Sequence, residues 1–146
     1  MKVTMMLADS AQSVGGKLYI LGGGWSVTGP GPCPSALAVL VSVPWNETNR
    51  KHRLKMDLLD EDYRPVLLPT PDGAVPLTIQ NEFEVGRPPG IVPGSSIEVP
   101  FAFNIGPIPL PPGKRLVWKL TIDDKSDENW QVIFSTRPAG QSPANA

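Results

Sequence analysis

Length, composition and charge restrict the classes of protein to which this sequence can belong. The chain has 146 residues, with 13 Lys and Arg against 14 Asp and Glu and a formal net charge of −1. This length fits a single domain with a core large enough to need no disulfide. The balanced charge argues against nucleic acid or an anionic membrane as the main partner, because both attract a clear excess of basic residues.

Glycine and proline are abundant, with 14 and 18 residues respectively. Because these residues interrupt helices and strands, their frequency favours many short elements. Cys33 is the only cysteine, so no intrachain disulfide can form. The apolar run within residues 1–10 is too short for a signal peptide, and no stretch approaches the ~18 apolar residues of a membrane span. We therefore expect a cytoplasmic protein that does not cross a membrane.

In the first half of the chain, strand-forming runs alternate with polar or glycine-rich connections. Residues 9–16 are polar and predict a turn, whereas 22–35 predict a long loop because they contain several glycines and prolines. Residues 44–51 are polar, and Asn46 could cap one helical turn there. The predicted strands are 3–7, 17–21, 36–43 and 53–59, the third being apolar enough for a central position.

In the second half, the clearest strand pattern is 97–105, where Ile97, Val99, Phe101, Phe103 and Ile105 occupy alternate positions. Three prolines make 67–76 an irregular crossing segment, and 86–95 and 106–113 read as stiff loops. The remaining predicted strands are 77–85, 116–122 and 130–134.

These runs, about eight short strands without a long helical period, predict an all-β fold. We expect an antiparallel two-sheet β-sandwich with Greek-key or jelly-roll connections, and a β-barrel is the alternative. Residues 1–136 would form the single domain and 137–146 a flexible C-terminal tail.

The sequence also resembles an uncharacterised bacterial family of small cytoplasmic proteins, with the longer loops of its actinobacterial members. The motifs that carry the resemblance are Ala8-Asp9, the run 15–22, the run 58–62 with Pro65, and Pro112-Gly113 before the strand 116–122. The resemblance spans about 1–134 and implies a β-rich single domain. It implies no activity, cofactor or catalytic residue.

The three consecutive glycines 22–24 are the first candidate for chemistry, because glycine-rich turns after strands can hold phosphates. A phosphate loop also needs a lysine and a following helix. Here the lysine is missing, and Pro30, Pro32 and Pro34 prevent the helix. A glycine-rich bend or bulge is the favoured interpretation.

His52 is the only histidine, so any serine or cysteine nucleophile would depend on it as a base. Cationic neighbours at 50, 51 and 53 favour a solvated turn, with a small anion site as the alternative. Cys33 lies between two prolines and has no base beside it in sequence, which favours a structural thiol over a nucleophile.

Two acidic clusters, 60–62 and 123–128, could supply oxygen ligands to a metal ion. Neither has the EF-hand spacing, and alternating strand directions would place them at opposite ends of the fold. We interpret them as turn-forming residues and predict no metal and no cofactor.

Alternating strand directions also gather the loops 22–35, 60–76 and 106–113 at one end. These loops would carry an apolar binding tip, formed by Trp25, Val27, Leu67, Leu68, Ile108 and Leu110. Folding of the loops over open sheet edges is the alternative. We predict a non-enzymatic binding or assembly module with a protein partner, a homo-oligomer being one form. A small-molecule or metal-dependent enzyme with an unrecognised site is the second hypothesis.

Overall fold

The computed structural model describes residues 1–140, and the regular elements in this part of the chain are almost all β-strands. One 3₁₀ turn, η1 (Trp45–Glu47), is present, and residues 1–140 contain no α-helix. No helix in this range is long and apolar enough to cross a membrane. The strands are β1 (Lys2–Ala8), β2 (Ser10–Val14), β3 (Lys17–Leu21), β4 (Val27–Thr28), β5 (Ser35–Val43), β6 (Lys51–Asp60), β7 (Leu67–Thr70), β8 (Gly73–Pro76), β9 (Thr78–Glu84), β10 (Ile97–Ile105), β11 (Arg115–Ile122) and β12 (Gln131–Thr136). The all-β prediction is confirmed.

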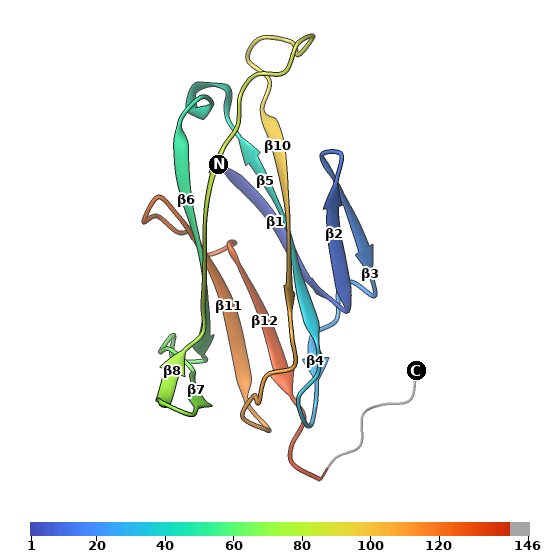
Figure 1. The fold of residues 1–146 in the computed structure, drawn as a ribbon, viewed down its shortest axis with the longest axis vertical. Helices are drawn as coiled ribbons and strands as arrows, with labels where there is room; N and C mark the ends of the chain where they lie inside the picture. The colour runs from blue at the N-terminus through green and yellow to red at the C-terminus, as the bar shows by residue number, and fades with distance from the viewer. Residues whose placement is uncertain (141–146) are drawn as a thin grey trace.

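Most strands belong to two open sheets (Figure 1), one with the order β1-β5-β10 and the other with the order β4-β12-β11-β6-β9. Paired strands are antiparallel except for the short β4, which runs parallel to β12. Each sheet ends in edge strands over the described residues, so neither closes on itself and the alternative of a β-barrel is wrong.

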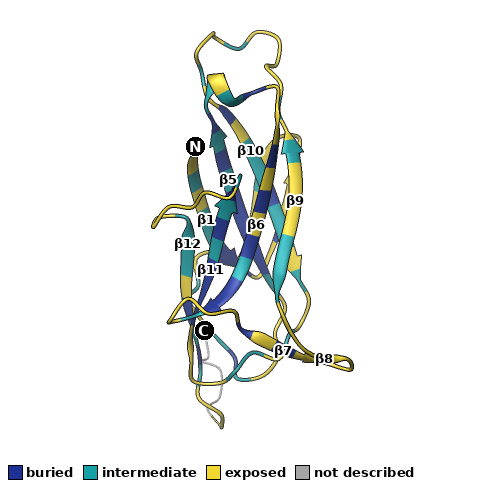
Figure 2. Ribbon diagram, turned by 90° about the vertical axis from the view of Figure 1, so that its left-hand side faces the viewer, coloured by how far each residue is buried: buried dark blue, intermediate teal, exposed yellow. Residues whose placement is uncertain are grey.

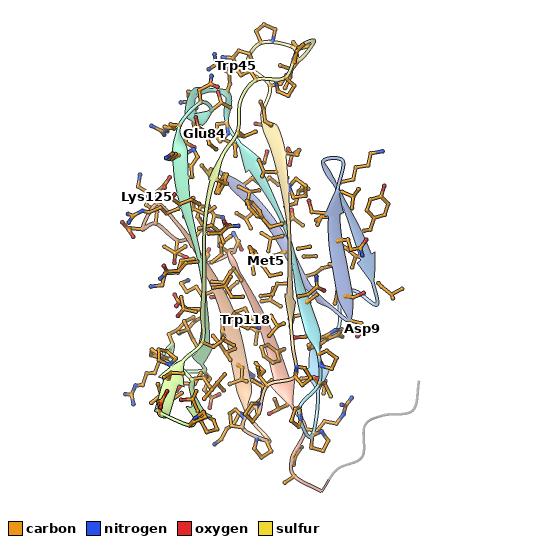
Figure 3. All side chains as sticks on the ribbon, viewed as in Figure 1. Met5, Asp9, Trp45, Glu84, Trp118 and Lys125 are labelled. Atoms are coloured by element: carbon orange, nitrogen blue, oxygen red, sulfur yellow. The ribbon has the colours of Figure 1, made fainter. Side chains whose placement is uncertain are left out.

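Apolar side chains from both large sheets share one core. On β5, Leu37 and Val39 point into this core, whereas Ala36 and Ala38 belong to a second cluster on the opposite face. In the other sheet, Leu58 of β6 pairs with Trp118 of β11, which lies well inside the molecule (Figure 3). This period-two alternation explains why strand prediction from the sequence succeeds here. Buried residues concentrate on β5, β6 and β11, while β9 and the β7–β8 hairpin are largely exposed (Figure 2).

A hairpin formed by β2 and β3 covers part of the outer face of the three-stranded sheet. Ala11 and Leu18 contribute to the alanine-rich second cluster, and small side chains allow the hairpin to approach closely. The turn Gly15-Gly16 has positive φ at both residues, 59° and 74°, which matches the right-handed twist of a two-residue hairpin. Beyond β3, a Cβ on Gly22 would collide with the carboxylate of Asp9, so close packing accounts for this glycine.

Three segments differ from the predictions, the first being residues 27–28, which form the short strand β4 within the predicted loop 22–35. Residues 10–14 form β2 rather than a turn, because pairing with β3 outweighs their polar composition. Residues 67–76 form the β7–β8 hairpin rather than an irregular segment, and Pro69 and Pro76 are tolerated there because this small sheet has open edges. In η1 the capping position is Pro44 without a side-chain cap, so the predicted cap at Asn46 is wrong.

The predicted tail 137–146 is described only as far as residue 140. Arg137 is tied to the body of the molecule: its N–H donates to Thr28 O at 2.9 Å, and its carbonyl accepts from Gly113 N at 3.1 Å. Residues 141–146 lie outside the described residues.

Candidate binding surfaces

The loops 22–35, 60–76 and 106–113 do gather at one end of the molecule, the lower end in Figure 1. Thr136 Oγ1 donates to Pro111 O at 2.6 Å, and Arg137 N donates to Thr28 O, so the first and third loops meet beside β12. Pro111 and Leu67 line the same shallow depression, which brings the second loop to the same end.

The six residues predicted to form an apolar tip do not form a common exposed patch. Trp25, Ile108 and Leu110 pack against the main core and line one cavity of about 20 Å³. That volume holds about one water molecule and is far too small for a metabolite. Leu68 is buried, whereas Val27 and Leu67 are 46% and 59% exposed.

Trp25 shows why this end of the molecule is mainly structural. Its ring meets Phe134 edge-on, with 6.1 Å between the ring centroids. Its Nε1 is buried and has no hydrogen-bond partner among the described residues. The residue expected to lead a binding tip therefore closes the end of the core.

His52 lies in β6 and is only 1% exposed, so its prediction as part of a solvated turn is wrong. Its Nδ1 is 2.6 Å from Asp123 Oδ2, and its Nε2 is 2.7 Å from Glu47 O. Both ring nitrogens are therefore engaged by acceptor oxygens of the protein itself. Neither nitrogen is available to accept a proton from a nucleophile.

Asp123 is the carboxylate partner of His52 in this contact. Its Oδ1 accepts a hydrogen bond from Arg53 N at 2.9 Å. Burial disfavours the charged carboxylate, but the hydrogen bonds from His52 and Arg53 N–H outweigh it and hold the pKa of Asp123 below its usual value of 3.8. The pair is thus a structural contact between β6 and the connection that follows β11.

The two acidic clusters lie at opposite ends of the β6–β11 pair, as predicted. Asp60 pairs with Leu116, and Ile122, next to the second cluster, pairs with Leu54. Asp60 Oδ1 accepts from Asp62 N and Arg64 N, and Asp127 Oδ1 accepts from Asn129 N, which is typical of turn-forming aspartates. Within residues 1–140, no three His, Cys, Asp or Glu side chains are placed to hold a metal ion. Cys33 is exposed.

The outer face of the β2–β3 hairpin is the most apolar exposed part of a sheet. Val14, Tyr19 and Leu21 are 55%, 56% and 70% exposed, and Ile20 is 38% exposed. Leu18 packs against the alanine-rich cluster, so the alternating Lys17, Tyr19 and Leu21 point to solvent. The sequence did reveal this alternation, but it did not show that β3 belongs to a small sheet separate from the core.

The backbone of β3 is unpaired along one edge. Val14 and Lys17 flank the two-residue turn and form a hydrogen-bonded pair, so Tyr19 also bonds inward to β2. The N–H and C=O groups of Leu18 and Ile20 therefore point away from β2, and no partner for them is found among residues 1–140.

The opposite edge of the hairpin supports this register. Ala11 is the non-hydrogen-bonded partner of Ile20, so its backbone groups must also point outward, away from β3. The side chain of Asn104 meets both: Oδ1 accepts from Ala11 N at 3.2 Å, and Nδ2 donates to Ala11 O at 2.8 Å. Asn104 thus occupies the edge of β2 at Ala11, and the edge of β3 is left open.

These features define an all-β protein with two open sheets around one core and an apolar hairpin on its outer face. The chain belongs to a family of unknown function, DUF6941, whose model matches residues 3–133. No curated protein and no solved structure matches the chain.

Proposed function

We propose that this chain is a non-enzymatic binding module that receives an extended strand of a protein partner along the free edge of β3. The observation that carries the proposal is the combination of unpaired backbone groups at Leu18 and Ile20 with the exposed side chains of Tyr19 and Leu21. In strand addition, main-chain hydrogen bonds provide affinity, and alternate side chains provide specificity.

The other sheet edges carry features that discourage pairing. The edge strand β9 presents the exposed charges of Glu82 and Glu84, and β10 contains Pro100, which lacks a donor. β4 is only two residues long, and on β1 the carbonyl of Leu7 already accepts from Gly24 N at 2.7 Å. β3 carries a single charge, Lys17 at its start, and otherwise presents Tyr19 and Leu21 on its solvent face, without a proline.

We also propose how the two large sheets are arranged. We assign the two facing sheets to the β-sandwich class, with Greek-key or jelly-roll connections, because side chains of both sheets share one core. The exposed free thiol of Cys33 fits a reducing compartment, in line with a cytoplasmic bacterial protein. The loop end acts chiefly as a cover for the core, since only Val27 and Leu67 of its six predicted residues are well exposed.

The proposal is tested with peptides selected on the immobilised chain from a displayed random library. We expect selected peptides to protect the amides of Leu18 and Ile20 from hydrogen exchange. Ile20→Pro removes one outward N–H without touching the bonds between β2 and β3, and should weaken peptide binding by at least about tenfold. Ile20→Val keeps the N–H and should bind as the wild type does. Failure to select any peptide, or protection elsewhere than on β3, would overturn the proposal.

A further inference from the structure

We infer that the strand received by β3 is β3 of a second copy of this chain, running antiparallel about a two-fold axis at Tyr19. The inference rests on the proposed function and names its partner. The two hairpins would then form one continuous four-stranded sheet, in the order β2-β3-β3-β2, between the copies.

The register of β3 is compatible with its own reversal. Outward backbone groups lie at Leu18 and Ile20, symmetrically on either side of Tyr19. An antiparallel partner centred on Tyr19 places Leu18 of one copy opposite Ile20 of the other, and each such pair exchanges two hydrogen bonds. Four main-chain hydrogen bonds result. Each outward N–H and C=O group of Leu18 and Ile20 then has a partner in the other copy.

The side chains of the solvent face are self-complementary in the same register. The two Tyr19 rings occupy a non-hydrogen-bonded pair, where opposing side chains come closest, and aromatic pairs are favourable there. Lys17 of one copy lies opposite Leu21 of the other, so no two like charges face each other.

The position of the hairpin leaves room for a second molecule. β2 lies between β3 and the body of the protein, and β3 forms the margin of the molecule on that side (Figure 1). Each copy offers one such edge, so an isologous contact closes at two copies and does not continue into a fibre. An unrelated partner strand would satisfy the same backbone groups but would not be required to place a second Tyr19 opposite Tyr19.

The test uses opposite charges at the symmetry axis. In Tyr19→Glu or Tyr19→Lys, two like charges face each other across the two-fold axis, so we expect each variant alone to sediment as a monomer at concentrations where the wild type is dimeric. An equimolar mixture should restore the dimer, because each pair then holds one Glu and one Lys. The same substitutions at Tyr63, which is 50% exposed in a turn elsewhere, should leave the dimer intact.

Three results would overturn the inference: a wild type that stays monomeric over the whole concentration series, a dimer that persists in both single variants, or a mixture that remains monomeric. The proposed function fails separately. A monomeric wild type that still binds selected peptides along β3 removes the second copy and leaves strand addition in place. A dimer restored in the mixture cannot arise from unfolded variants, so loss of folding is controlled within the same experiment.

Discussion

At the scale of single residues, the contact between His52 and Asp123 gives the protein a pH-dependent component of stability. The pKa of Asp123 is lower in the folded chain than its usual value of 3.8, owing to its hydrogen bonds with His52 and Arg53 N–H, which outweigh the opposing effect of burial. Folding therefore gains stability from the ionised carboxylate above that value, and this gain is lost as pH falls through the folded pKa.

We expect Asp123→Asn to lower the free energy of unfolding at pH 7 by about 1–2 kcal/mol, because a charged partner of the buried imidazole is lost. The Asp123 side chain is 40% exposed, so solvent screening keeps the effect at the modest end. Asparagine tolerates the left-handed backbone at this position, where φ is 52°, so backbone strain should not contribute. Urea unfolding at pH 7 and at acid pH measures the difference.

The variant should also lose less stability on acidification than the wild type does, since the carboxylate with the lowered pKa is gone. Asp124→Asn is the matched control, because Asp124 forms only an exposed ion pair with Arg53. Equal acid sensitivity in wild type and Asp123→Asn would contradict the assignment.

The sequence could not reveal this contact. The alternation of His52, Leu54 and Met56 on one face was visible, but the cationic neighbours suggested solvent instead. The partner Asp123 lies 71 positions away in the chain, and only the pairing of β6 with β11 brings the two side chains together. For Trp25 the sequence suggested exposure, whereas the side chain packs against the core. A loop position in the sequence does not tell whether a side chain points out or back onto the core.

At the scale of elements, the β2–β3 hairpin is attached to the three-stranded sheet by few contacts. The alanine-rich cluster provides close packing, and Asn104 binds both backbone groups of Ala11. Ser13 Oγ adds one bond to Pro100 O at 3.3 Å. An element held this lightly is expected to open locally before the rest of the protein unfolds.

We expect Asn104→Ala to cost about 1 kcal/mol and to act mainly on the hairpin, because Ala11 would lose both partners of its outward backbone groups. Native-state hydrogen exchange should show faster exchange of the β2 and β3 amides, with the amides of β5 and β11 unchanged. Gln12→Ala, on the exposed face of the same hairpin, should change neither. Unchanged protection of the hairpin in Asn104→Ala would mean that packing alone holds it.

The strand β3 was predictable from its alternation and from the glycine turn before it. Its partner β2 was not, because Ser10, Gln12 and Ser13 have poor strand propensity and gain their conformation from pairing. The exposed edge of β3 depends on that pairing, so the surface proposed for binding could be located only in three dimensions.

At the scale of the whole molecule, one core joins the two large sheets. Leu37 and Val39 from the three-stranded sheet share a single cluster with Leu58 and Trp118 from the five-stranded sheet. Alternating apolar positions in the sequence predicted a shared core, but they did not predict which strands would become neighbours. With no second core of comparable size in residues 1–140, neither sheet has a way to remain folded when the other is lost.

We therefore expect a single cooperative unfolding transition, in which tryptophan fluorescence and far-UV circular dichroism coincide. Leu37→Ala, at a fully buried position of β5, should lower the free energy of unfolding by about 2–5 kcal/mol and shift both signals together. Leu40→Ala is the matched control, because Leu40 lies on the same strand but is only partly buried on the outer face, and its effect should be smaller. If tryptophan fluorescence, to which Trp118 of the five-stranded sheet contributes together with Trp25, Trp45 and Trp130, stayed native while circular dichroism fell in Leu37→Ala, the two sheets would be separate folding units. The proposed dimer adds a condition that follows from mass action: the midpoint of the wild type should rise with protein concentration, whereas that of Tyr19→Glu should not.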